Sequence, residues 1–149
     1  MDDNKFTMGY SIERKTPEIV QDYFRGRRFS ARDALSDDLE YNCEPFLDNI
    51  LETIQGTYLN GLGNEFERFE KVSDALSKFP EHEEDIAVLG NCILNISVGE
   101  IEDIGDNWAR VYIDLTFDKE RLFNLLGIAD VIKEAEKDRT TKSHDTRER

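Results

Sequence analysis

The chain has 149 residues, a length that corresponds to one domain with an ordinary hydrophobic core. Charged residues make up 35% of it and the formal net charge at pH 7 is −14, so its surface is strongly acidic. Such a surface repels nucleic acid and anionic lipid and attracts basic partners, although a general bias towards solubility also produces acidic proteins. No apolar run is long enough to span a membrane and the N-terminus has no signal-peptide core, which predicts a soluble, cytoplasmic protein.

The first predicted helix begins at Thr16-Pro17-Glu18. This segment combines an N-cap hydroxyl, a proline at the first helical position and a carboxylate at the positive end of the helix dipole. Gly26 ends the helix inside the densest basic patch of the chain, Arg25–Arg32. The four arginines of this patch could bind phosphate beside Phe29, or they could neutralise nearby acidic segments. The acidic surface favours the second interpretation.

Three further helices are predicted between residues 30 and 80. One of them begins with a capping box at Ser30 and continues through Leu35 or Leu39. Another follows Glu44-Pro45 and the third follows Asn64, and both show apolar residues at intervals of three and four. The expected buried stripes are Phe46, Leu47, Ile50, Leu51, Ile54 and Tyr58 in the former, and Phe66, Phe69, Val72 or Ser73, Leu76 and Phe79 in the latter. Segment 80–90 fits either a helix or the start of a strand.

The centre of the predicted fold is a β-hairpin over residues 91–117. Both of its strands alternate apolar and polar side chains, which is the period of a half-buried strand, and the polar loop between them contains a glycine. The register that places both apolar sets on one face pairs Asp103 with Asp106 across a two-residue turn and sets Val98 opposite Val111. The predicted core-facing set is Cys92, Leu94, Ile96, Val98, Val111, Ile113, Leu115 and Phe117.

The last predicted helix is capped by Asp118 and continues through Ile132, with Gly127 as a kink. Residues 133–149 contain one apolar side chain, so 140–149 is expected to be a charged, disordered tail after a single globular domain over residues 1–139. Together, these elements predict an α+β domain in which several helices pack on a small antiparallel sheet built around the hairpin.

No catalytic, metal or cofactor motif is present in the sequence. Cys43 and Cys92 lie far apart, and His82 and His144 have no cysteine or histidine at ligand spacing. We therefore predict no catalytic residues, no bound metal, no cofactor and a protein that is not an enzyme. A small enzyme that uses carboxylates as acid and base would need a buried carboxyl group with a raised pKa, which the sequence does not locate.

Two long segments contain acidic residues without any lysine or arginine. Residues 33–67 contain nine aspartates and glutamates, and residues 79–109 contain eight. Acidic faces usually carry interspersed lysines that relieve the repulsion between like charges. Their absence from both segments favours a surface that binds a basic partner.

The predicted partner site lies at the tip of the hairpin. In the register above, Ile101 falls opposite Trp108 on the face away from the core, with Tyr112 on the same side. An aromatic cluster with an acidic rim has the composition of a protein interface, although a helix that covered this face would also account for it. The predicted partner-binding residues are Glu100, Ile101, Glu102, Asp103, Asp106, Trp108 and Tyr112.

In its acidic charge, small size, lack of a catalytic motif and helix-plus-hairpin layout, the chain resembles the immunity proteins of bacterial toxin systems, above all those of contact-dependent growth inhibition. The resemblance is one of type across the whole chain and includes no shared motif, so no residue role is transferred. It implies a cytoplasmic inhibitor that binds one basic toxin domain, often a nuclease, at or near its active site. The alternative is an acidic regulator or adaptor that contacts another protein or nucleic acid through Arg25–Arg32.

Overall fold

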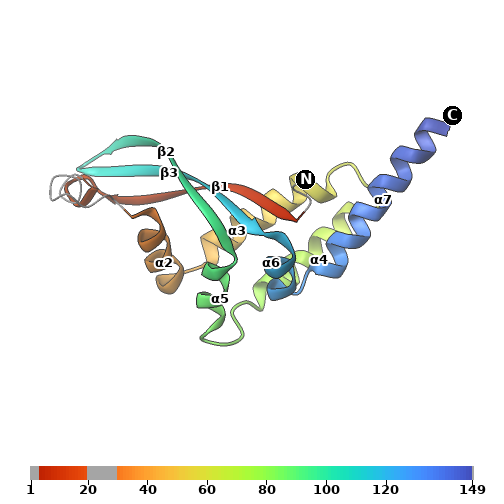
Figure 1. The fold of residues 1–149 in the computed structure, drawn as a ribbon, viewed down its shortest axis with the longest axis horizontal. Helices are drawn as coiled ribbons and strands as arrows, with labels where there is room; N and C mark the ends of the chain where they lie inside the picture. The colour runs from red at the N-terminus through yellow and green to blue at the C-terminus, as the bar shows by residue number, and fades with distance from the viewer. Residues whose placement is uncertain (1–3, 20–29, 149) are drawn as a thin grey trace.

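A three-stranded antiparallel sheet in the order β1–β3–β2 carries helices on one of its faces (Figure 1). The computed structural model describes residues 4–19 and 30–148, with side chains up to residue 140. In chain order the elements are β1 (Lys5–Lys15), α2 (Ala31–Tyr41), α3 (Glu44–Ile54), the π-helix η1 (Gln55–Leu59), α4 (Glu65–Ser77), α5 (Asp85–Asn91), β2 (Ile93–Gly105), β3 (Trp108–Asp118), α6 (Lys119–Leu126) and α7 (Ala129–Glu148). The predicted α+β class, with helices on a small antiparallel sheet, is confirmed.

Strand β3 is the centre of the sheet and of the core. Its alternating residues Val111, Ile113, Leu115 and Phe117 are all buried, as their period of two predicted. As alternate residues of one strand they share a face of the sheet. That face packs against the helices, where β-branched and aromatic side chains fit well. The ring of Phe117 lies 6.1 Å from that of Phe46 of α3, centroid to centroid, so β3 contacts the helical layer directly.

Strand β1 was not predicted, although its sequence carries the same signal. Phe6, Met8 and Ile12 alternate with polar residues and are buried against β3. The strand pairs with the whole of β3, from Lys5 opposite Asp118 to Lys15 opposite Trp108, without a shift of register. The predicted hairpin is therefore two strands of a larger sheet, and β3 is its middle strand.

The predicted register of the hairpin is wrong. The turn is formed by Asp106 and Asn107, with φ of 57° and 66°, and Gly105 pairs with Trp108. A two-residue turn with positive φ at both positions matches the right-handed twist of the flanking strands, and aspartate and asparagine tolerate that conformation. Two bulges in β2 between the turn and Val98 partly reduce this offset, so that Val98 lies opposite Ile113 instead of Val111, and a third bulge lies between Ile93 and Asn95.

The burial predicted for the first strand of the hairpin is also largely wrong. Leu94 and Val98 are 51% and 47% exposed, and Cys92 is buried as the C-cap of α5, outside the strand. Leu94 is the extra residue of the first bulge, so Ile93 takes the buried position in its place. Strand β2 is an edge strand, and Ile96, the remaining member of the predicted set, is only partly buried.

Most of the predicted helices are present, and the caps at Ser30 and Asp118 form as predicted, whereas the side chain of Asn64, predicted to cap the helix that follows it, makes no capping hydrogen bond to α4. The Ser30 hydroxyl accepts a hydrogen bond from the Asp33 N–H, and the Asp118 carboxylate accepts one from the Arg121 N–H. Segment 80–90, which the sequence left open, contains helix α5. Residues 16–19 are helical, but the rest of the first predicted helix and most of the Arg25–Arg32 patch lie outside the described residues.

Helix α4 departs from its predicted stripe. Phe66 is 72% exposed, whereas Arg68 is buried beside Val72 and Leu76. The guanidinium of Arg68 donates to the carboxylates of Glu134, at 3.2 Å, and of Asp138. The side chain is buried because α7 supplies these two acceptors, which compensate for the removal of a charge from water.

The last predicted helix is divided into α6 and α7. Gly127 adopts φ of 74°, the left-handed conformation of a helix C-cap, and so ends α6 instead of kinking a continuous helix. Helix α7 packs through Ile132 and Ala135. Its backbone stays helical through Glu148, and its last turns protrude from the body of the molecule where the sequence predicted a charged tail (Figure 1).

Tyr58, in η1, connects the sheet with the C-terminal helices. The centroid of its ring lies 6.3 Å from that of Phe6 and 5.8 Å from that of Phe123. The Nζ of Lys119 lies 5.2 Å from the centroid of the Tyr58 ring. Burial and, secondly, the charge of Glu136 raise the pKa of Tyr58 to about 12.

Replacing Tyr58 by phenylalanine should therefore reduce the loss of stability in alkali. Between pH 10 and pH 12 the unfolded chain has released the phenol proton while the folded chain retains it, so stability is complete below this window and falls through it. Because the side chain is partly solvated, we expect Tyr58→Phe to remove about 1 kcal/mol of this fall. Urea denaturation at about pH 9 and about pH 11 measures it, and an equal fall in both proteins would contradict the assignment.

Candidate protein-binding groove beside strand β1

The structure separates the seven predicted partner-binding residues into two groups. Directly opposed residues of an antiparallel pair point to the same face of the sheet. Trp108, Arg110 and Tyr112 alternate with the buried residues of β3, so they lie on the face away from the helices, called here the outer face. Glu102 lies on the outer face too, because it is paired with Arg110. The Glu102 carboxylate accepts a hydrogen bond of 3.3 Å from the Tyr112 hydroxyl.

The other group does not share this face. Ile101 pairs with Val111 and Asp103 with Ala109, which places both on the helix side, so the predicted pairing of Ile101 with Trp108 is wrong. Glu100 belongs to the bulge between Val98 and Ile101, and Asp106 belongs to the turn. The position of the turn caused the pairing error, and the bulge between Asp103 and Gly105 shifts the pairing by one residue, which places Ile101 and Asp103 on the helix side.

Arg110 links the three strands on the outer face. Its guanidinium lies 2.9 Å from the Glu13 carboxylate of β1 and 3.4 Å from the Glu102 carboxylate of β2. Hydrogen bonds to Tyr112 and then to Glu13 raise the pKa of Arg110, so it remains charged. These pairs are solvent-exposed and contribute little to stability, but they neutralise part of the charge of the predicted acidic rim.

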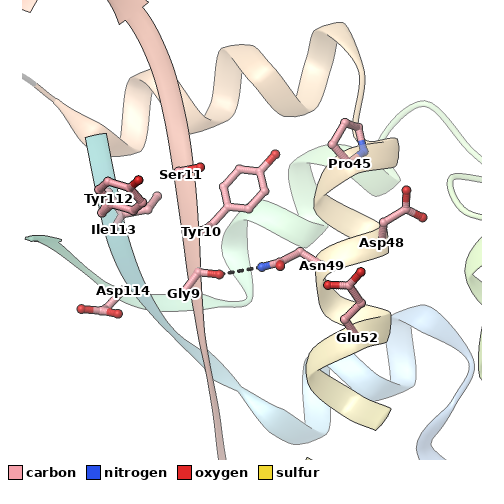
Figure 2. A pocket seen from close by; sticks show the side chains of 10 residues that line it. All are labelled: Gly9, Tyr10, Ser11, Pro45, Asp48, Asn49, Glu52, Tyr112, Ile113 and Asp114. Atoms are coloured by element: carbon pink, nitrogen blue, oxygen red, sulfur yellow. Dashed lines mark hydrogen bonds between the residues drawn. The ribbon is translucent and has the colours of Figure 1, made fainter. Parts of the chain in front are cut away.

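A groove runs between β1 and α3, beside the edge of the sheet (Figure 2). We call it the β1 groove; its volume is about 570 Å³ and it is lined by Gly9, Tyr10, Ser11, Pro45, Asp48, Asn49, Glu52, Tyr112, Ile113 and Asp114. At its middle the Asn49 amide donates a hydrogen bond of 2.6 Å to the Gly9 carbonyl oxygen. The groove is thus formed by three elements that are distant in sequence.

The charge of the β1 groove is entirely negative among its lining residues. Asp48 and Glu52 are four residues apart, so they lie on one face of α3 (Figure 2). Asp114 of β3 lies on the other side of β1, on the outer face of the sheet, and its carboxylate points away from α3 (Figure 2). No lysine or arginine lines this groove. Asp48 and Glu52 belong to the lysine-free segment 33–67, so the sequence indicated their charge but not their position beside β1.

A second hollow of about 630 Å³ extends the β1 groove towards the tip of the hairpin. The two share Tyr10, Ser11, Pro45 and Tyr112, and the second adds Trp108, so both predicted aromatic anchors face one continuous depression. Its wall is held by ordered polar contacts, since Arg14 lies 2.9 Å from Asp38 and donates to the Ala34 carbonyl at 2.8 Å. Burial and, secondly, the charge of Asp38 raise the pKa of Tyr10.

The described residues contain no group of three or more histidine, cysteine, aspartate or glutamate side chains placed to hold a metal ion. Burial raises the pKa of the Cys92 thiol, which fits the role of a small core residue predicted for it. Among the helices of the described residues, none is both long and apolar enough to cross a membrane.

The depression beside β1 thus combines partly exposed aromatic side chains, Trp108 and Tyr112, with nearby carboxylates. This composition is typical of protein interfaces. Comparison of the chain with protein-family models, with curated proteins and with solved structures found no match.

Proposed function

We propose that this protein binds a basic protein partner through the outer face of its sheet and the β1 groove, and that the partner is a cationic toxin domain which it neutralises. The observation that supports the proposal is the groove itself, where Tyr112 borders Asp48, Glu52 and Asp114 and no lysine or arginine is among the lining residues. Trp108 borders the adjoining hollow, whose two arginines, Arg14 and Arg110, are paired with Asp38 and Glu13. The resemblance in type to immunity proteins supports the choice of a toxin, often a nuclease, as the partner.

The acidic charge serves the first stage of binding. A net charge of −14 attracts a basic domain over a Debye length of about 8 Å, which raises the association rate. A nuclease recognises phosphate through lysine and arginine, so an acidic groove competes for the same side chains. Binding there would block the substrate-binding surface of the toxin without any chemical step.

The aromatic side chains serve the second stage. Trp108 and Tyr112 are 39% and 37% exposed, and burial of such rings at the centre of an interface gives the largest contributions to affinity. No comparable observation favours the alternative of a nucleic-acid adaptor, because most of Arg25–Arg32 lies outside the described residues.

Replacing Trp108 by alanine should raise the dissociation rate from the partner by about 30-fold, the effect of losing about 2 kcal/mol at an interface hot spot. The partner to use is the C-terminal domain of any large secreted protein that is encoded directly upstream. Surface plasmon resonance gives the rates, and Phe66→Ala is the matched control because Phe66 is an exposed aromatic residue of α4 that lines neither hollow. If both variants dissociate like the parent, the outer face is not the binding site.

A further inference from the structure

The free edge of β1 has a defined set of outward-pointing backbone groups. The Thr16 N–H donates to the Asn107 carbonyl at 2.7 Å and the Lys119 N–H donates to the Asn4 carbonyl at 2.8 Å, and both pairs continue the register between β1 and β3. In an antiparallel ladder, hydrogen-bonded and non-hydrogen-bonded pairs alternate. The even-numbered residues of β1 therefore bond to β3, and the odd-numbered residues direct their N–H and C=O groups away from the sheet.

Side chains satisfy only some of these outward groups. The Gly9 carbonyl accepts from Asn49, which confirms its outward direction, and the Glu13 carbonyl accepts from the Arg14 guanidinium at 2.8 Å. Within the described part of the chain, the N–H and C=O of Ser11 have no protein partner. Ser11 lines both hollows, so these two backbone groups face the depression.

The two edges of the sheet differ in their ability to accept another strand. Strand β2 carries three register shifts, and bulges of this kind twist an edge away from further pairing. Strand β1 pairs with β3 over eleven consecutive positions without a shift, so its backbone is regular along its length. A regular edge with unpaired backbone groups is the template for adding a strand.

Charge decides which strand would be accepted. A second copy of this chain is disfavoured, because each copy carries a net charge of −14 and β1 would bring two sets of Asp48, Glu52 and Asp114 together. An extended segment with lysine or arginine is favoured by Asp48 and Glu52, which line the groove beside Ser11. Its apolar or aliphatic parts would contact Tyr10, Pro45 and Tyr112, which line both hollows.

We propose that an extended lysine- or arginine-bearing segment of the partner adds to the free edge of β1 as a fourth strand, bonding to the backbone of Ser11 and placing its cations against Asp48 and Glu52. This inference rests on the proposed function, whose partner it describes more closely. Main-chain hydrogen bonds hold the segment and the acidic groove selects its charge. The segment is centred on Ser11, because the Gly9 carbonyl already accepts from Asn49 and the Glu13 carbonyl from Arg14.

The test removes the outward N–H of Ser11. Proline lacks this group and is tolerated on an edge strand where the N–H points away from the sheet, so Ser11→Pro keeps the ladder with β3. Ser11→Ala is the matched control, since it removes the hydroxyl and keeps the backbone. We expect Ser11→Pro to weaken binding of the toxin domain about tenfold or more and Ser11→Ala to leave it unchanged, with circular dichroism and thermal unfolding confirming that both variants fold.

A synthetic probe separates this inference from the proposed function. A short peptide of alternating lysine and valine should bind the parent at low salt and slow hydrogen exchange at the Ser11 amide, measured by NMR. A peptide of alternating lysine and proline, with the same charge but a backbone restricted to the polyproline conformation, should not. If the toxin domain does not bind but the lysine–valine peptide protects Ser11, the edge accepts a basic strand and the toxin proposal fails.

Three results would overturn strand addition. The first is a toxin domain that binds Ser11→Pro as tightly as the parent while Trp108→Ala is weakened, which would leave the proposed function standing. The second is equal binding of both peptides without protection of the Ser11 amide, which would show attraction by charge alone. The third is a parent dimer, detected by sedimentation equilibrium, that Ser11→Pro dissociates, since a second copy would then occupy the edge.

Discussion

Replacing Leu115 by alanine is expected to lower the free energy of unfolding by about 2–5 kcal/mol. Leu115 is 1% exposed and lies in the middle strand of the sheet, between Met8 of β1 and Ile96 of β2. Its truncation leaves a cavity that both neighbouring strands and the helices would have to move to fill. Urea denaturation monitored by circular dichroism measures the loss.

Leu94→Ala is the matched control for this experiment. The apolar period placed Leu94 on the same face as Leu115, whereas the structure leaves it half-exposed in a bulge. The same truncation there should lower the free energy of unfolding by less than about 1 kcal/mol, because little cavity is created. A loss below about 1 kcal/mol for Leu115 itself would contradict the central position of β3.

Arg68→Ala should lower the free energy of unfolding by about 2–3 kcal/mol. The substitution removes charge-assisted hydrogen bonds to Glu134 and Asp138 and the packing of a buried aliphatic stem between α4 and α7. The two carboxylates it leaves behind are at least half exposed, so water solvates them and the loss stays below that of an isolated buried charge.

Two further substitutions separate the contributions of Arg68. Arg68→Met keeps most of the stem and removes the charge, so it should lose less stability than Arg68→Ala. Phe66→Ala should change the free energy of unfolding by no more than about 0.5 kcal/mol, because Phe66 is exposed. If Phe66→Ala is the more destabilising of the two alanine substitutions, the orientation of α4 is wrong.

Helix boundaries and the central strand could be predicted from the sequence because their causes are local. The caps at Ser30 and Asp118 depend on a side chain and an N–H three residues later. The alternation of β3 depends on which of its own neighbours are apolar. Strand β1 has equally local signals in the alternation of Phe6, Met8 and Ile12 with polar residues, so the sequence was sufficient to predict it.

The register of β2 and the burial of Arg68 depended on residues distant in sequence. Three bulges interrupt the pairing of β2 with β3, and the apolar period of β2 gives no sign of them. Arg68 is a polar residue by composition, and its burial depends on Glu134 and Asp138, which α7 brings to it. Sequence periodicity accounts for neither because it describes one element at a time.

The sequence by itself determined the acidic character of the candidate site and two of its aromatic side chains, Trp108 and Tyr112. The tertiary structure alone decided that these rings share a depression with Tyr10 of β1 and Asp48 of α3, and that Ile101 and Asp103 face the other side of the sheet. Residue type is fixed at each position of the chain, and net charge is the sum over those positions, so both follow from the sequence without the fold. The groove is a property of three packed elements, and its position depends on strand pairing and helix packing, which join residues far apart in sequence.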